Sequence, residues 1–143
     1  MLTRTQLKDL LARHGLQPLK RLGANYLIDA NIKDKIIAAA GPCPAERLLE
    51  IGPGLGALTA DLAASGARVT AVEKDRKAAR ILQETLGAHL PDLTVIQGDI
   101  LDFDIASFAA GEKILVVGNL PYYITSPIIE LVIAHAPLIR RAV

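Results

Sequence analysis

The sequence predicts an α/β fold, in which a parallel sheet is covered by helices on both faces. Short apolar segments typical of buried parallel strands alternate with segments that repeat apolar residues every three or four positions, as helices do. This order gives β-α-β-α-β with right-handed crossovers. The chain has 143 residues, of which 51% are hydrophobic and 22% charged, so its size and composition fit one globular domain.

Two helices are predicted before the first strand. The segment 3–14 has leucines on one face and ends at Gly15. Asp29 or Asn31 can serve as the N-cap of a second helix, which ends at Gly41. Its apolar positions are Ile32, Ile36 and Ile37.

The remaining elements alternate between strand and helix. We predict strands at 47–51, 68–72, 93–97 and 113–117, and helices at 57–65, 76–86 and from about 127, with Ser126 as the N-cap of the last. The final residues, 137–143, are interpreted as a loop that enters another strand and stops before it can pair.

A glycine-rich loop separates the first strand from its helix. Residues 50–57 read Glu-Ile-Gly-Pro-Gly-Leu-Gly-Ala. Glycines let the backbone turn tightly and approach a ligand, and a helix N-terminus follows directly. The spacing of Gly52, Gly54 and Ala57 also satisfies the dinucleotide fingerprint, so the loop alone leaves open whether the ligand is a nicotinamide or an adenosyl cofactor.

Two acidic residues follow the next two strands. Glu73 directly follows the second predicted strand, where a carboxylate can accept hydrogen bonds from both ribose hydroxyls of an adenosine. Asp99 follows the third strand, where it can accept a hydrogen bond from an adenine amino group. Asp75 fits better as a helix cap. The glycine loop, Glu73 and Asp99 at three successive strand ends together favour an adenosyl ligand.

The segment 119–123 follows the fourth predicted strand and reads Asn-Leu-Pro-Tyr-Tyr. Asn119 offers an amide oxygen, Leu120 a backbone carbonyl that Pro121 makes rigid, and Tyr122 a flat ring. These groups can together hold the exocyclic amine of a planar base at the carboxyl edge of the sheet. A proline turn with a core tyrosine is the simpler alternative for this segment taken alone.

Charge is unevenly distributed along the chain. Residues 1–21 carry a net charge of +4, which leaves −3 for the rest of a chain whose total is +1. A basic arm can steer a protein toward RNA phosphates, although a solvated helix face is an equal alternative. The basic residues of this arm are Arg4, Lys8, Arg13, Lys20 and Arg21.

Other residue types exclude several classes of site. The single Cys43 cannot form an internal disulfide, and the three histidines lack the spacing of metal ligands, so we expect no metal. The N-terminus has no apolar signal segment, and no apolar run reaches the length of a membrane span. These features predict a cytoplasmic protein without a membrane partner.

With these motifs identified, the chain resembles the ribosomal RNA adenine N6,N6-dimethyltransferases, which methylate adenines near the 3′ end of small-subunit rRNA. The resemblance runs from about Leu16 to the last residue. It rests on the segments 20–29, 50–54, 72–75, 98–99 and 119–122. Where the family usually has Gln and Phe, this chain has Ala24 and Tyr26, so the ring is kept but an amide is lost.

The resemblance implies a Rossmann-like, class I S-adenosylmethionine-dependent methyltransferase. It assigns S-adenosylmethionine as the cofactor and immature small-subunit rRNA as the partner. It implies an arm over 1–28 and an incomplete methyltransferase domain over 29–143, with further strands and a helical C-terminal domain absent. The expectation is therefore a fragment that binds cofactor, transfers methyl groups weakly or not at all, and self-associates through an open sheet edge. The implied cofactor residues are Asn25, Leu27, Gly52, Gly54, Glu73, Asp99 and Asn119.

The implied reaction is in-line transfer of the sulfonium methyl group to N6 of adenine, twice on each of two adjacent adenines. Asn119 and the Leu120 carbonyl would accept the N6 protons and aim the nitrogen lone pair, while Tyr122 would stack on the base. Three alternatives stay open: another N6-adenine or glutamine amino-methyltransferase, a nicotinamide oxidoreductase, and a non-enzymatic rRNA-binding assembly factor.

Overall fold

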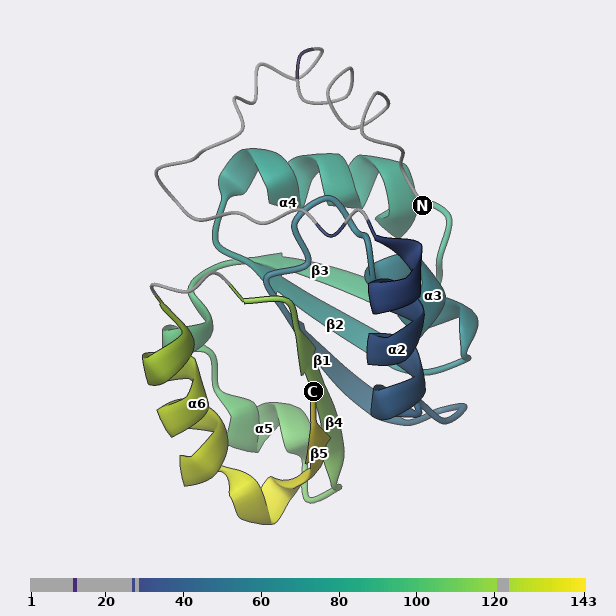
Figure 1. The fold of residues 1–143 in the computed structure, drawn as a ribbon. Coiled ribbons are helices and arrows are strands. Elements are labelled where there is room, and N and C mark those ends of the chain that lie inside the picture. Colours follow the sequence, from purple (N-terminus) through teal and green to yellow (C-terminus); the bar gives the residue numbers. More distant parts are fainter. Residues whose placement is uncertain (1–11, 13–26, 28, 121–123) are drawn as a thin grey trace.

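Five parallel strands form one sheet in the computed structural model, which describes residues 12, 27, 29–120 and 124–143. The strands lie in the order β3-β2-β1-β4-β5 (Figure 1). Their bounds are Arg47–Ile51 for β1, Arg68–Glu73 for β2, Leu93–Gln97 for β3, Ile114–Gly118 for β4 and Ile139–Ala142 for β5. The predicted parallel α/β fold is confirmed, and the first four strands match their predicted positions to within one residue.

Helices cover both faces of this sheet (Figure 1). One face is covered by α2, α3 and α4, and the other by α5 and α6. The bounds are Ala30–Ala40 for α2, Thr59–Ala64 for α3, Arg76–Leu82 for α4, Ile105–Ala109 for α5 and Thr125–Ala134 for α6. Strand side chains alternate between the two resulting cores: Leu48 packs with the first group of helices and Leu49 with the second.

Capping residues set the ends of α2 as the sequence predicts. Of the two candidate caps, Asp29 is the one used: its carboxylate accepts hydrogen bonds from the backbone N–H groups of Asn31 at 2.9 Å and Ile32 at 3.3 Å. Gly41 ends the helix in the left-handed conformation, with φ of 54°.

Several helix boundaries differ from the prediction. The segment 76–86 ends as a π-helical turn, Gln83–Gly87, and α5 was missed because five residues show no helical period. The prediction that Ser126 caps the last helix is wrong. The helix begins at Thr125, Ile124 occupies the cap position without a side-chain bond, and Ser126 and Pro127 lie in the first turn, where proline needs no N–H partner.

The end of the chain corrects a second expectation, because the last strand does pair. β5 lies parallel to β4, with Ile114 opposite Ile139. Beyond β5, Val143 donates to the carbonyl of Val116 at 3.0 Å and accepts from Gly118 at 2.9 Å. Side chains of β5 hold it in place: Arg140 pairs with Glu46 at 2.6 Å, and Arg141 donates to the Ala39 carbonyl at 2.7 Å. Four residues therefore suffice for a strand here.

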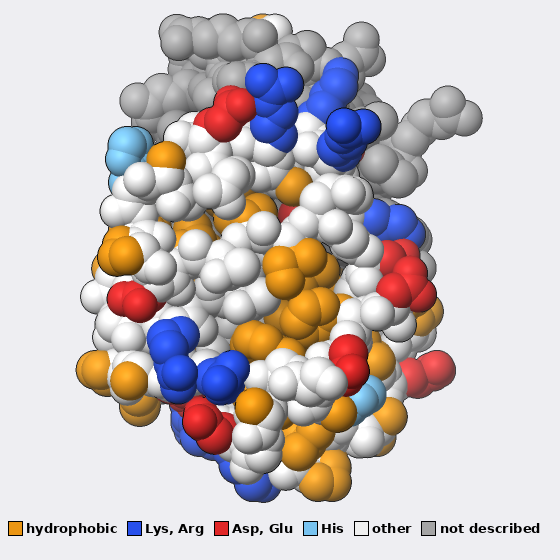
Figure 2. All heavy atoms as spheres, turned by 180° about the vertical axis from the view of Figure 1, so that it is seen from behind, with side chains coloured by type: hydrophobic (Ala, Val, Ile, Leu, Met, Phe, Trp, Pro, Cys, Tyr) orange, Lys and Arg blue, Asp and Glu red, His pale blue; other side chains and the backbone are white. Residues whose placement is uncertain are grey.

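An apolar groove of about 330 Å³ lies between α6 and the carboxyl ends of β1, β4 and β5. Its lining includes Ile129 and Ile133, which are 50% and 66% exposed. Figure 2 shows hydrophobic side chains gathered on the face of the molecule behind the view of Figure 1. In the described part of the chain, β5 also forms an edge of the sheet.

We predict that this chain self-associates through the β5 edge and the apolar groove, since exposed strand edges and apolar surface both favour association. Sedimentation velocity should show an average mass that rises with concentration, and Ile133→Glu should reduce the rise. Ile32→Glu is the matched control, because Ile32 is 44% exposed on α2, which covers the opposite face. A monomer at all concentrations would contradict the prediction.

Candidate functional site

The predicted site residues of three neighbouring strands meet at the carboxyl edge of the sheet. Ile51 in β1 lies opposite Val72 in β2 and Gly118 in β4. The next residues along the three strands are therefore Gly52, Glu73 and Asn119. The chain leaves β1 toward β2 on one side, while β4 pairs on the other, which makes this edge the topological switch point where α/β proteins bind ligands.

The glycine loop is open at its start and tightly packed at its end. Gly52 has φ of 63°, and a Cβ placed on it would meet nothing within 4 Å. Gly56 has φ of 86°, and a Cβ there would lie 2.7 Å from a side-chain carbon of Leu86 and 2.8 Å from one of Leu82. Gly56 thus allows the loop to pack against α4 and the following turn, while Gly52 leaves backbone accessible to a ligand.

Glu73 ties the glycine loop to the beginning of α4. One carboxylate oxygen accepts the N–H of Gly54 at 2.9 Å and the other accepts the N–H of Asp75 at 2.8 Å. The side chain is 9% exposed. Burial raises the pKa of Glu73, and these two backbone hydrogen bonds oppose that rise. Because each carboxylate oxygen has a second lone pair, the group can still accept hydrogen bonds from a pair of hydroxyls.

Asp99 lies at the same edge but is already paired in part. Its Oδ2 accepts from the Lys74 ammonium at 2.6 Å and its Oδ1 accepts from the backbone N–H of Leu101 at 3.0 Å. The hydrogen bond from Lys74 is the main cause that lowers the pKa of Asp99. Asp75 is the N-cap of α4, as predicted, with its carboxylate 2.8 Å from the N–H groups of Lys77 and Ala78.

At the end of β4, Asn119 and Leu120 are half-buried beside the glycine loop. A Cβ on Gly118 would lie 3.0 Å from a Leu120 methyl carbon and 3.1 Å from the Ile51 carbonyl oxygen. The glycine therefore lets β4 approach β1 closely where the Asn-Leu segment begins. Of the other predicted site residues, Leu27 is half-buried and packs against the core that also contains Leu48.

The remaining predicted residues lie outside the described part of the chain. These are Asn25 of the cofactor set, Pro121 and Tyr122 of the base-binding set, and the basic residues Arg4, Lys8, Arg13, Lys20 and Arg21. Their assignments stay predictions.

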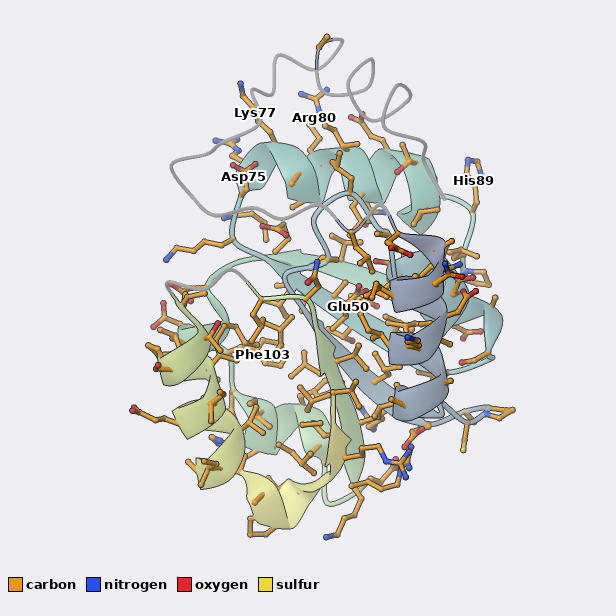
Figure 3. All side chains as sticks on the ribbon, in the orientation of Figure 1. Glu50, Asp75, Lys77, Arg80, His89 and Phe103 are labelled. Carbon is orange, nitrogen blue, oxygen red and sulfur yellow. The ribbon has the colours of Figure 1, made fainter. Side chains whose placement is uncertain are left out.

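The sequence analysis missed Glu50, a buried carboxyl group at this edge. It is 1% exposed, and its Oε2 has no hydrogen-bond partner; Figure 3 shows it in the interior, whereas Lys77 and Arg80 point away from the sheet. Burial raises the pKa of Glu50 to about 8; the neighbouring Thr59 hydroxyl lowers it and Glu73 raises it. The sequence did contain a signal for it, because a glutamate within a strand that is predicted to be buried is unusual.

The described residues contain no cluster of three or more His, Cys, Asp or Glu side chains that could hold a metal ion, and Cys43 is exposed and free. None of the helices in this part of the chain has the length and hydropathy of a membrane span.

The sheet order, the glycine loop and the acidic residues at successive strand ends define a Rossmann-like fold of the S-adenosylmethionine-dependent methyltransferase class. Solved structures agree. The 23S rRNA methyltransferase ErmE superposes with a TM-score of 0.73 at 37% identity, over 82% of this chain and 46% of that one. A dimethyladenosine transferase from Plasmodium falciparum gives a TM-score of 0.69 at 32% identity, over 82% and 42%.

Sequence comparison narrows the class to a family. The model of the ribosomal RNA adenine dimethylase family matches residues 16–143, and the chain belongs to this family. Ribosomal RNA small subunit methyltransferase A of Deinococcus radiodurans is 54% identical over 120 residues, which cover 84% of this chain and 40% of that protein. The Pelotomaculum thermopropionicum protein of the same name is 46% identical, over 85% and 44%. The chain thus spans less than half the length of these relatives.

Because Glu73 bonds two backbone N–H groups, its loss should destabilise the fold as well as the site. We expect Glu73→Ala to lower the free energy of unfolding by about 1–3 kcal/mol, the cost of leaving buried donors unpaired. Glu73→Gln, which keeps one acceptor oxygen, should cost less. Urea denaturation measures both, and Glu84→Ala, at a half-exposed side chain in the π-helical turn after α4, is the control. If Glu73→Ala matched Glu84→Ala, the two hydrogen bonds would not stabilise the loop.

Proposed function

We propose that this chain carries the cofactor-binding and base-binding edge of an enzyme that transfers methyl groups from S-adenosylmethionine to N6 of adenine in small-subunit rRNA. Two methyl groups on each of two adjacent adenines are the expected product. The observation that carries the proposal is the Glu73 carboxylate, held by Gly54 and Asp75 next to an open Gly52 in a chain of this family.

The described residues fit an adenosyl cofactor. The backbone at Gly52 is open to close approach, and the buried Glu73 carboxylate keeps lone pairs free for two ribose hydroxyls. Asp99 can accept from an adenine amino group through the lone pairs that its bonds from Lys74 and Leu101 leave open. When bound, the cofactor supplies an electrophilic methyl group on a sulfonium.

The residues after β4 would prepare the adenine. Its N6 lone pair is delocalised into the ring, so the free amine is a weak nucleophile. Hydrogen bonds from the two N6 protons to the Asn119 amide oxygen and the Leu120 carbonyl favour a pyramidal nitrogen, and they strengthen as the nitrogen becomes positive in the transition state. A neutral amide suits this half-buried position because a carboxylate would cost more to desolvate. Tyr122 would stack on the base and hold it in plane.

The 143 residues match less than half the length of these relatives, so we propose cofactor binding for this chain and methyl transfer to RNA for the whole protein. We propose an immature small ribosomal subunit as the substrate, which would place the reaction in the cytoplasm. Arg4, Lys8, Arg13, Lys20 and Arg21 would add salt-sensitive contacts to RNA phosphates.

The test measures incorporation of labelled methyl groups into immature small subunits. We expect little transfer by the 143-residue chain, and activity when it is joined to the remainder of the Deinococcus radiodurans relative. In that active chimera, Asn119→Ala should lower the rate about 10²-fold or more, the scale for losing a preorganised polar contact. Tyr122→Phe should be nearly silent and Tyr122→Ala severe, because stacking needs the ring.

Two outcomes would contradict these assignments. Equal damage from Tyr122→Phe and Tyr122→Ala would show that the hydroxyl matters and that stacking is the wrong role. Full activity of Asn119→Ala would show that the Asn119 amide takes no part in methyl transfer. Leu101→Ala, at an exposed position in the short helix after β3, is the control for general effects of substitution.

A further inference from the structure

The two halves of the glycine loop are held in different ways. In the first half, the Gly52 N–H donates to the Val72 carbonyl at 3.0 Å. The Gly54 N–H donates to the Glu73 carboxylate at 2.9 Å, so both bonds fasten the loop to β2. In the second half, the N–H of Gly56 donates at 3.0 Å to a carbonyl of the loop itself. Packing against other elements must therefore hold the second half in place.

Two leucines provide this packing. Gly56 is buried, and a Cβ on it would lie 2.7 Å from a δ-carbon of Leu86 and 2.8 Å from one of Leu82, so these side chains fill the space next to its backbone. Leu82 is fully buried and belongs to the core beneath the helices. Leu86 is only half-buried, at the margin of that core. Contact with the loop is thus the more particular role of Leu86.

Leu86 lies in an unusual segment of the chain, the π-helical turn Gln83–Gly87 that follows α4. The Thr85 hydroxyl donates to the Ile81 carbonyl at 2.7 Å, which satisfies a backbone acceptor where the hydrogen-bond pattern of the helix changes. A π-helical turn inserts one extra residue into a helix, and such turns are frequent at functional sites. Here the turn places Leu86 against Gly56, at the end of the loop that the cofactor would approach.

We propose that Leu86 is a positioning residue for the cofactor: by packing on Gly56 it holds the glycine loop in the shape that leaves Gly52 open to S-adenosylmethionine. This inference rests on the proposed function. Leu86 acts through the loop and not by contact with the cofactor.

The effect on binding follows from the order of the loop. A loop that is fixed before binding loses little conformational freedom when the ligand arrives. Leu86→Ala removes the δ-carbon beside Gly56, so the second half of the loop gains conformations that binding must again exclude. The affinity should then fall, although the hydrogen bond at Gly54 remains.

Isothermal titration calorimetry of S-adenosylmethionine into the 143-residue chain measures this change. We expect Leu86→Ala to raise the Kd about tenfold, and Leu86→Met, which keeps a long apolar side chain, to stay within about twofold of wild type. Leu90→Ala is the matched control, since Leu90 is half-buried against the same core but is not among the nearest neighbours of Gly56. It should destabilise the fold as well, yet bind as wild type does.

Amide hydrogen exchange without cofactor tests the loop contact itself, which a general loss of stability would not affect selectively. The two alanine variants are compared at equal free energy of unfolding, set by adding urea to the more stable one. The segment 52–57 should exchange faster in Leu86→Ala than in Leu90→Ala, because exchange there reports local opening of the loop.

Three results would overturn the proposal. Equal exchange of the loop in the two alanine variants, or equal affinity of both for S-adenosylmethionine, would remove the role of Leu86 alone. If the wild-type chain bound no S-adenosylmethionine, the proposed cofactor site and this role would both fall. If Leu86→Ala did not fold, Leu86→Val compared with Leu90→Val decides in its place, because valine also lacks the δ-carbon next to Gly56.

Discussion

The site depends on one interaction, the pair of backbone hydrogen bonds that Glu73 accepts from Gly54 and Asp75. These bonds connect the loop after β1 to the turn between β2 and α4. The two loops are therefore held together and form one continuous surface at the edge of the sheet. The left-handed conformations at Gly52 and Gly54 are sustained by this anchor and by the bond from the Gly52 N–H to the Val72 carbonyl. Asn119 can then lie at a fixed distance from the loop, because β4 pairs directly with β1.

Two carboxyl groups on adjacent strands differ in their hydrogen bonding. Burial raises the pKa of both, but two backbone hydrogen bonds oppose the rise at Glu73, whereas Glu50 lies in the interior with an unpaired oxygen and a pKa of about 8. The lone pairs that remain on Glu73 suit a ligand that presents hydroxyl groups. The ion pair of Asp99 with Lys74 adds further charged groups at the same edge of the sheet.

Local patterns were sufficient to predict most of the framework. β1 is a short apolar run before glycine, and α2 has a capping aspartate and a terminating glycine, so both were predicted to within a residue of their bounds. The features that were not predicted depend on contacts between residues that are far apart in the sequence. β5 is held by Arg140 on Glu46, which are 94 residues apart, and the Lys74 partner of Asp99 lies on another strand's loop. Glu50 is a different case: it was missed although it lies within a segment that the sequence already predicts as a buried strand.

The central claim is that this edge of the sheet accepts an adenosyl sulfonium cofactor and not a dinucleotide, although the glycine spacing allows either. One calorimetric comparison decides it, in which the 143-residue chain is titrated with S-adenosylmethionine and separately with NAD. The account predicts saturable binding of S-adenosylmethionine at one site per chain and no measurable heat from NAD. Binding of NAD with equal or greater affinity would contradict it.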